Sequence, residues 1–196
     1  MIRRAVIGVT GGIATGKSTV LAILREQGAV TIDADAVYHS LIAPGGWLVG
    51  PIGVRFGEQV LSDDGSIDRR ALAGIVFADP AALADLDQIT HPTVIETITK
   101  LIDSAAAPIV AVDAVKLIES GMHEHCDAVW LVTCDPVVQK ARLMARSGLS
   151  GDEVDLRLAA QPDDAHRRQY ADVVLDNSGE LASLRRQVEV ALTLVK

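Results

Sequence analysis

The stretch from residue 5 to residue 18 reads Ala5-Val6-Ile7-Gly8-Val9-Thr10-Gly11-Gly12-Ile13-Ala14-Thr15-Gly16-Lys17-Ser18. It opens with an uninterrupted apolar run, Ala5–Val9, which is typical of a buried strand. A glycine-rich turn follows, and residues 18–27 then have the pattern of an amphipathic helix that Gly28 is placed to end. A strand, a glycine loop and a helix in direct succession predict the beginning of an α/β fold.

Residues 11–18 match the phosphate-binding motif G-x-x-x-x-G-K-[ST] at every fixed position, between a predicted strand and a predicted helix. The glycines let backbone N–H groups turn toward phosphate oxygens, and the helix start adds its own unpaired amides. Lys17 can bridge the β- and γ-phosphates of ATP, and the Ser18 hydroxyl can ligate Mg²⁺. The alternative is a glycine-rich turn with an incidental Lys-Ser pair, which the flanking elements disfavour. The residues expected to bind ATP here are Gly12, Ile13, Ala14, Thr15, Gly16, Lys17, Ser18 and Thr19.

Four further short apolar runs are spaced along the chain, namely Ala29–Ile32, Ile109–Val112, Ala128–Thr133 and Val173–Leu175. They are continuous rather than alternating, and helical patterns separate them. Strands of this kind are buried on both faces, so the sequence predicts a five-stranded parallel sheet covered by helices in a three-layer α/β fold.

Two segments exceed what simple connections between strands need. Residues 40 to about 105 contain helical patterns around Arg69–Phe77 and Pro92–Ala105, and predict a helical insertion. Residues 140 to about 168 contain a helix that breaks at Ser147-Gly148 and then a charged stretch, which fits a mobile lid or an ordinary helical hairpin. We expect residues 1–196 to form a single domain carrying both.

The composition limits the partners and the compartment. The formal net charge of −8 argues against a nucleic-acid-binding protein, although it allows a nucleotide site with a local positive field. Two cysteines do not make a disulfide framework, and no apolar run approaches the length of a membrane span, so we expect a cytoplasmic protein with no membrane partner. Nothing in the sequence indicates the oligomeric state.

The motif alone does not separate a kinase from a GTPase or a motor ATPase. GTPases usually read guanine with an Asn-Lys-x-Asp segment, but the only asparagine of this chain, Asn177, is followed by Ser178-Gly179. Motor ATPases generally need a larger core. A small-molecule kinase is therefore favoured.

With this motif placed, the remaining segments resemble the dephospho-CoA kinase family along nearly the whole chain. Each matching piece is short, but their order and spacing together are specific. The pieces are Thr10–Ser18, Asp33-Ala34-Asp35, His91-Pro92, Asp135-Pro136, Arg142, Arg146, Gln161, Arg167, Ala171-Asp172 and Asp176-Asn177-Ser178-Gly179. The resemblance implies a P-loop kinase core that transfers the γ-phosphoryl of ATP to the ribose 3′-hydroxyl of dephospho-CoA, with Mg²⁺ as cofactor. It also adds Asn177 to the residues expected to bind ATP.

Asp33 and Asp35 follow the second strand, where ligands gather in open α/β sheets. Asp35 is the candidate that orients the acceptor hydroxyl and accepts its proton, and Asp33 is a second acceptor-side candidate. The alternatives are a solvated strand end or, for Asp33, a cap on the next helix. His91, before Pro92, could cap or orient a helix or contact the acceptor.

Arg142 and Arg146 lie four residues apart and share a helix face. They are either a solvated basic face or, as the resemblance implies, a pair that neutralises charge on the transferring phosphoryl group. Asp113 ends an apolar run and is a candidate Mg²⁺ ligand together with Ser18, or a helix cap. The cluster of His123, His125 and Cys126 has no second ligand pair at zinc spacing and is not expected to bind a metal.

Two positions depart from the family's pattern. Ala14 stands where a third glycine is common, and Val115-Lys116 stands where Pro-Leu is usual. The second departure concerns the acceptor side. Two other functions stay open: a P-loop kinase for a nucleoside or nucleotide, and a non-catalytic ATP-binding regulator.

Overall fold

The computed structural model describes residues 4–161 and 164–195. Five strands form one sheet in the order β2-β3-β1-β4-β5. Their bounds are β1 (Ala5–Thr10), β2 (Val30–Asp33), β3 (Ile109–Asp113), β4 (Ala128–Thr133) and β5 (Val173–Asp176). The central strand β1 pairs in parallel with both neighbours, and Ile7 lies opposite Ala111 on one side and Ala128 on the other. The predicted α/β class with a five-stranded parallel sheet is confirmed.

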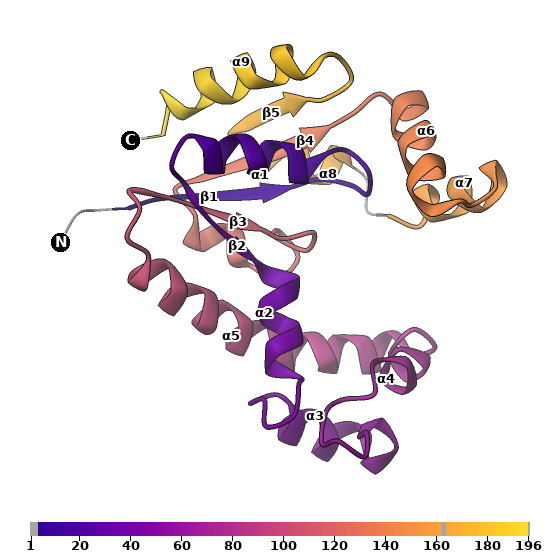
Figure 1. The fold of residues 1–196 in the computed structure, drawn as a ribbon. Coiled ribbons are helices and arrows are strands. Elements are labelled where there is room, and N and C mark those ends of the chain that lie inside the picture. The colour runs from indigo at the N-terminus through magenta and orange to yellow at the C-terminus, as the bar shows by residue number, and fades with distance from the viewer. Residues whose placement is uncertain (1–3, 162–163, 196) are drawn as a thin grey trace. The chain divides into compact units, whose positions relative to one another are not determined.

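Helices α1 (Lys17–Glu26) and α9 (Leu181–Leu192) cover one face of this sheet together, as Figure 1 shows. The apolar core beneath them includes Ile7, Leu24 and Trp130, each at most 1% exposed. The opposite face at Gly8 lies so close to Leu117 and Cys126 that an added methyl group would meet both side chains. Alternation along β1 therefore buries both faces of the strand, which explains its continuous apolar sequence.

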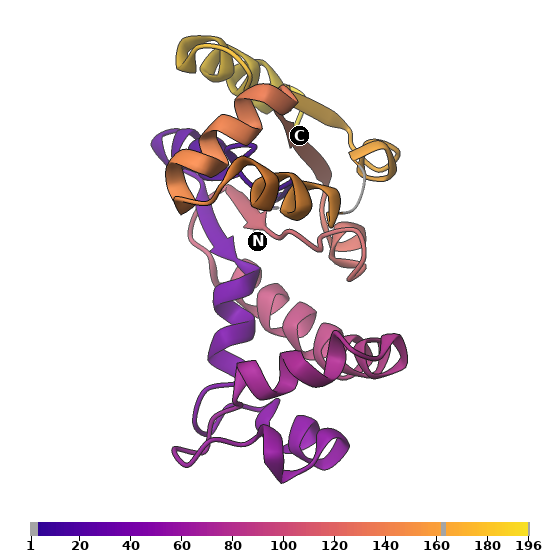
Figure 2. The same cartoon turned by 90° about the vertical axis from the view of Figure 1, so that its right-hand side faces the viewer.

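The chain divides into two compact units, of which the first contains residues 1–32 and 105–196 and the second contains residues 33–104. The second unit consists of helices: α2 (Ala34–Leu41), α3 (Val49–Phe56), the 3₁₀ turn η1 (Glu58–Val60), α4 (Arg69–Val76) and α5 (Pro80–Ser104). Helix α5 packs against α2, α3 and α4, and Figure 2 shows α2 alongside it. The predicted insertion at residues 40–105 overlaps this unit but starts seven residues after it.

The prediction that a helix begins at Pro92 is wrong. Helix α5 runs for 25 residues from Pro80, with Pro92 inside it. His91 therefore caps no helix. It lies one turn after Asp87, and its Nε2 is 3.3 Å from the Asp87 carboxylate.

In the first unit, the segment after β4 folds as a helical hairpin. Helix α6 (Pro136–Ser147) ends at Gly148, whose φ of 67° suits glycine, and α7 (Gly151–Ala159) begins with a capping box between Ser150 and Glu153. Lys140 and Asp155 join the two helices at 2.6 Å. Helix α8 (Asp164–Arg168) comes next. Residues 162–163 of the predicted lid lie outside the described residues.

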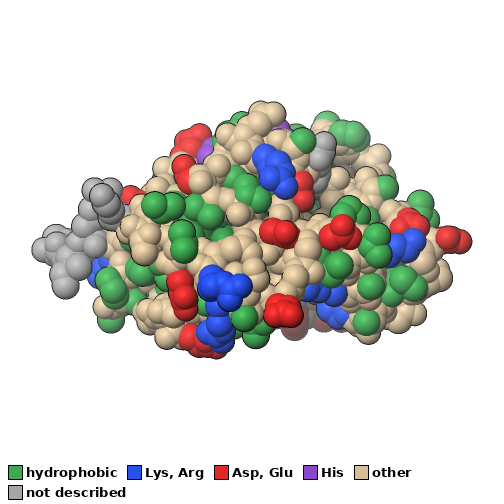
Figure 3. Space-filling model, turned by 90° about the horizontal axis from the view of Figure 1, so that it is seen from above, with side chains coloured by type: hydrophobic (Ala, Val, Ile, Leu, Met, Phe, Trp, Pro, Cys, Tyr) green, Lys and Arg blue, Asp and Glu red, His purple; other side chains and the backbone are tan. Residues whose placement is uncertain are grey.

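The face seen in Figure 3 carries acidic and basic side chains interspersed with apolar ones. An exposed ion pair between Arg185 of α9 and Glu26 of α1 links the two helices of the first unit. Within the described residues, no helix is long and apolar enough to cross a membrane.

Candidate active site

The loop between β1 and α1 forms a tight turn in which several residues have positive φ angles. Gly11 and Gly16 have φ values of 152° and 96°, and Ala14 has a φ of 60°. Ala14 is the only described residue other than glycine with a positive φ. The departure from glycine at this position therefore places a methyl group in the left-handed region, which is strained for an L-residue.

Side chains and backbone hold the loop in this shape. The Lys17 ammonium donates a hydrogen bond to the Gly11 carbonyl at 3.1 Å, and the Thr15 hydroxyl donates to the Gly12 carbonyl at 2.9 Å. Asn177 follows β5, is 6% exposed, and donates from its side-chain amide to the Thr15 carbonyl at 2.8 Å. A methyl group on Gly16 would collide with that amide. The structure thus gives Asn177 a role that its sequence position did not reveal, namely support of the loop from the adjacent strand end.

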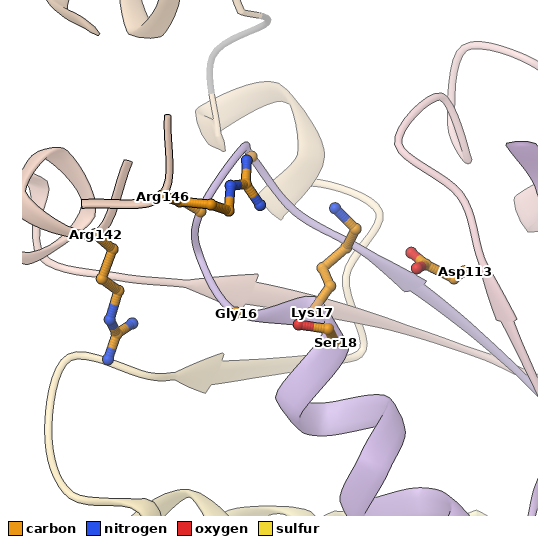
Figure 4. A pocket seen from close by; sticks show the side chains of 8 residues that line it. Gly16, Lys17, Ser18, Asp113, Arg142 and Arg146 are labelled. Atoms are coloured by element: carbon orange, nitrogen blue, oxygen red, sulfur yellow. The ribbon is translucent and has the colours of Figure 1, made fainter. Parts of the chain in front are cut away.

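A pocket of about 350 Å³ opens above the loop. It is lined by Gly12, Ala14, Gly16, Lys17, Ser18, Asp113, Arg142 and Arg146. Figure 4 shows Arg146 extending from α6 over the loop, with Lys17 and Asp113 on the other side. Three cations, Lys17 on α1 and two arginines on α6, face one carboxylate, which makes this pocket suited to a polyphosphate.

The oxygen ligands in this pocket fit Mg²⁺. Ser18 starts α1 and Asp113 ends β3, and both line the pocket. Mg²⁺ is commonly held by one or two protein oxygens, with substrate phosphates and water completing an octahedron. Among the described residues, no group of three or more His, Cys, Asp and Glu side chains could hold a metal ion, and a phosphate-bridged Mg²⁺ requires none.

A second pocket of about 330 Å³ adjoins the first, and the two share Gly16 and Arg142. Its other lining residues are Thr19, Asn177, Gly179 and Leu181. The Arg142 guanidinium donates to the Asn177 carbonyl at 2.9 Å and lies 3.3 Å from the Cys134 sulfur. Arg142 and Arg146 therefore share a helix face but differ in environment. Of these two pockets, Arg146 lines the first, whereas Arg142 lines both.

Both cysteines belong to the first unit, and burial raises the pKa of each thiol. The effect is larger for Cys126, whose pKa rises to about 12 because burial disfavours the thiolate and the nearby Asp127 carboxylate adds to this. For Cys134 the same desolvation dominates, while Arg142 partly opposes it and so limits the rise in pKa. Neither thiol has the lowered pKa of a nucleophile.

The acceptor-side candidates lie in the second unit. Asp35 is exposed in the first turn of α2. Asp33 is the N-cap of that helix, because its carboxylate accepts hydrogen bonds from the N–H groups of Asp35 at 2.9 Å and Ala36 at 3.1 Å. The capping alternative for Asp33 is therefore what the structure shows. His91 lies in α5 beside Asp87.

Sequence reasoning missed Gln139 altogether and named Gln161 only as part of the resemblance. Both side chains bind the backbone of Ile13 in the phosphate loop. A signal for Gln139 was present, since it precedes Arg142 by three residues and shares its face of α6.

The comparisons with known proteins agree with this geometry. The family model described as dephospho-CoA kinase matches residues 5–183. A dephospho-CoA kinase of Symbiobacterium thermophilum is 47% identical over 189 residues, which cover 95% of this chain and 79% of that protein.

Among solved structures, a protein from Thermus thermophilus superposes with a TM-score of 0.82 at 34% identity, covering 99% of both chains. A dephospho-CoA kinase from Campylobacter jejuni has a TM-score of 0.69 at 27% identity, covering 97% of this chain and 96% of that one. The match of the family model to most of the sequence, together with these similarities, assigns the chain: it belongs to the dephospho-CoA kinase family.

Proposed function

We propose that this protein transfers the γ-phosphoryl group of ATP to the ribose 3′-hydroxyl of dephospho-CoA, giving coenzyme A and ADP. The observation that carries the proposal is the convergence of Lys17, Ser18, Asp113 and Arg146 on one pocket, in a chain that matches this family from residue 5 to residue 183. The identity of the acceptor is inferred from the activity named for the relatives, and the pocket is the site proposed for the ATP phosphates.

ATP binds with its phosphates in the first pocket. Backbone N–H groups of the loop and the start of α1 receive phosphate oxygens, and Lys17 and Arg146 add positive charge. Ser18 and Asp113 would hold Mg²⁺, which supplies charge neutralisation when bound. The nucleoside end occupies the second pocket, beside Arg142 and the support provided by Asn177.

The transfer forms a bond between the γ-phosphorus and the 3′-oxygen of the acceptor and breaks the bond to the oxygen that bridges to the β-phosphate. The hydroxyl proton passes to the Asp35 carboxylate, and the electron pair of the broken bond stays on ADP. Because phosphoryl transfer depends mainly on positioning and charge neutralisation, Asp35 acts as much by orienting the hydroxyl as by accepting its proton. His91 is assigned to the acceptor side, as is Asp33 in addition to its capping role. Segment 140–168 acts as the lid that carries the two arginines.

The test is a panel assay with purified protein, ATP·Mg²⁺ and one acceptor at a time. We expect ADP release and a 3′-phosphorylated product with dephospho-CoA, and neither with nucleosides or nucleoside monophosphates. Turnover with a nucleoside but not with dephospho-CoA would replace the proposed acceptor. Binding of ATP without turnover of any acceptor would instead identify a nucleotide-binding regulator.

We also assign the activity to the cytoplasm. Both cysteines are free thiols in the structure, which fits a reducing compartment.

A further inference from the structure

Two glutamine side chains close on a single residue of the phosphate loop. Gln161 accepts a hydrogen bond from the Ile13 N–H through its Oε1 at 2.8 Å. Gln139 donates a hydrogen bond from its Nε2 to the Ile13 carbonyl at 2.7 Å. The polarity of the backbone fixes both amide orientations, because an N–H can meet only an acceptor and a carbonyl only a donor.

The two glutamines come from the two ends of the α6–α7 hairpin. Gln139 lies in the first turns of α6, and Gln161 lies two residues beyond the end of α7. Lys140 and Asp155 tie the helices together between these points. Both ends of the α6–α7 hairpin are therefore hydrogen-bonded to the loop.

The neighbouring glycine shows how closely the glutamines approach. A Cβ atom on Gly12 would lie 3.0 Å from Gln161 Oε1 and 3.2 Å from Gln139 Nε2. The two side chains thus pass over the same backbone position, and any residue larger than glycine at position 12 would push on both.

The same helix face carries the arginines of the site. Gln139, Arg142 and Arg146 follow one another at intervals of three and four residues, so they point from α6 in a common direction. Fixing Gln139 on Ile13 sets the rotation of α6, and the rotation of α6 sets where the two guanidinium groups lie relative to the pocket.

We propose that Gln139 and Gln161 are positioning residues that clasp Ile13 and thereby align the arginine face of α6 with the polyphosphate of bound ATP. Neither glutamine lines the pocket, so they act through the loop and through the arginines. This role rests on the nucleotide part of the proposed function and is independent of which acceptor the enzyme uses.

The opposite polarity of the two contacts provides a matched test. Replacing Gln161 with Glu keeps the acceptor for the Ile13 N–H, whereas Gln139→Glu removes the donor and places a carboxylate against a carbonyl oxygen. Both changes add one negative charge near Gly12, so repulsion of ATP is common to them and cancels in the comparison. Gln139→Met and Gln161→Met remove each contact without adding charge, and Gln169→Glu adds the charge at an exposed position away from the loop.

The Kd for ATP·Mg²⁺ is measured by calorimetry, kcat with dephospho-CoA, and the melting temperature without nucleotide. We expect Gln139→Glu to bind ATP about tenfold more weakly than Gln161→Glu, as one lost hydrogen bond and one new repulsive contact predict. Its kcat should also be lower, because the arginines are misaligned. We expect Gln161→Glu to bind at least as well as Gln161→Met, since the acceptor is retained.

Equal Kd and kcat values for the two Glu variants would overturn the proposal. So would losses of ATP affinity and kcat that only follow the loss in melting temperature, because the contacts would then stabilise the fold without aligning the arginines. If the parent protein bound ATP but did not phosphorylate dephospho-CoA, the proposed acceptor would fail, while the Kd comparison would still decide the role of the glutamines.

Discussion

Replacing Ala14 with glycine should stabilise this protein, although glycine usually destabilises. Ala14 has a φ of 60°, where an L-residue is strained by about 1–2 kcal/mol. Glycine removes this strain but gives the unfolded chain more freedom, which costs about 0.4–1 kcal/mol. The balance is a gain of about 0.8 kcal/mol in the free energy of unfolding, or a rise of roughly 2–3 °C in melting temperature for a chain of this size.

Tryptophan fluorescence can follow the unfolding of the unit that contains the loop. Trp130 is fully buried in β4, whereas Trp47 is 84% exposed in the other unit, so the change in emission on unfolding reports mainly on the sheet. Thermal and urea unfolding of Ala14→Gly and of the parent protein, both without nucleotide, would give the difference directly. Because the loop keeps its shape, we expect the Kd for ATP to change by less than about threefold, equivalent to less than about 0.7 kcal/mol.

The control is Ala106→Gly, an exposed position in the connection before β3 where φ is negative. There the entropy of the unfolded chain acts alone, so stability should fall by about 0.4–1 kcal/mol. The reasoning is refuted if Ala14→Gly lowers the melting temperature as much as Ala106→Gly does, since the backbone at residue 14 would then carry no strain that glycine relieves.

Three other substitutions or treatments test the site. Gly16→Ala should destabilise the protein by about 2–3 kcal/mol in urea unfolding and abolish ATP binding. The reason is that φ at this residue is 96° and the Asn177 side chain occupies the space of the added methyl group. A variant as stable as the parent would contradict this. Asp35→Asn should lower kcat at least about 100-fold while leaving the Kd for ATP within about threefold, and a near-normal kcat would remove Asp35 from both assigned roles. Cys126 should stay unlabelled by a disulfide reagent at pH 8 until the protein unfolds, because its pKa of about 12 keeps the thiol protonated at this pH. Rapid labelling of Cys126 in the native protein, located by mass spectrometry, would show that the thiol is not buried.

The sheet could be predicted from the sequence because its three inner strands, β1, β3 and β4, are buried on both faces, and because the short edge strands β2 and β5 are also continuous apolar runs. Continuous apolar runs such as Ala128–Thr133 stand out from their polar surroundings. Each predicted run is found as a strand whose bounds differ by at most one residue at either end. The order of the strands in the sheet was not predicted, since it depends on how each crossover packs rather than on any local pattern.

Proline misled the interpretation of the second unit. The sequence predicts a helical pattern from Pro92, whereas α5 begins at Pro80 and has Pro92 in its interior, where proline is usually costly. In α5 the buried residues Ala82, Thr90, Ile98 and Ile102 continue on both sides of it, so tertiary burial outweighs the local preference. The consequence reached the candidate site, because His91 changed from a possible cap to a mid-helix residue beside Asp87.

The motif predicts the glycine-rich loop between β1 and α1 but not the side chains that support it. Asn177 is 162 positions from the Thr15 carbonyl that it binds, and Gln161 is 148 positions from the Ile13 N–H. A contact over that separation leaves no periodicity in the sequence. Only the chemistry of the residue type, an amide that can both donate and accept, indicates that such a contact could exist.

The strain at Ala14 and these distant contacts explain each other. A residue in the left-handed region costs about 1–2 kcal/mol and persists only where its surroundings fix the backbone on both sides. Ile13, before Ala14, has both of its backbone groups bound by glutamines, and Thr15, after it, is bound by Asn177. At about 0.5–1.5 kcal/mol for each hydrogen bond, these three contacts can together offset the strain. The loop therefore holds this shape without a ligand, so that under the proposed function less of the energy of ATP binding is needed to order it.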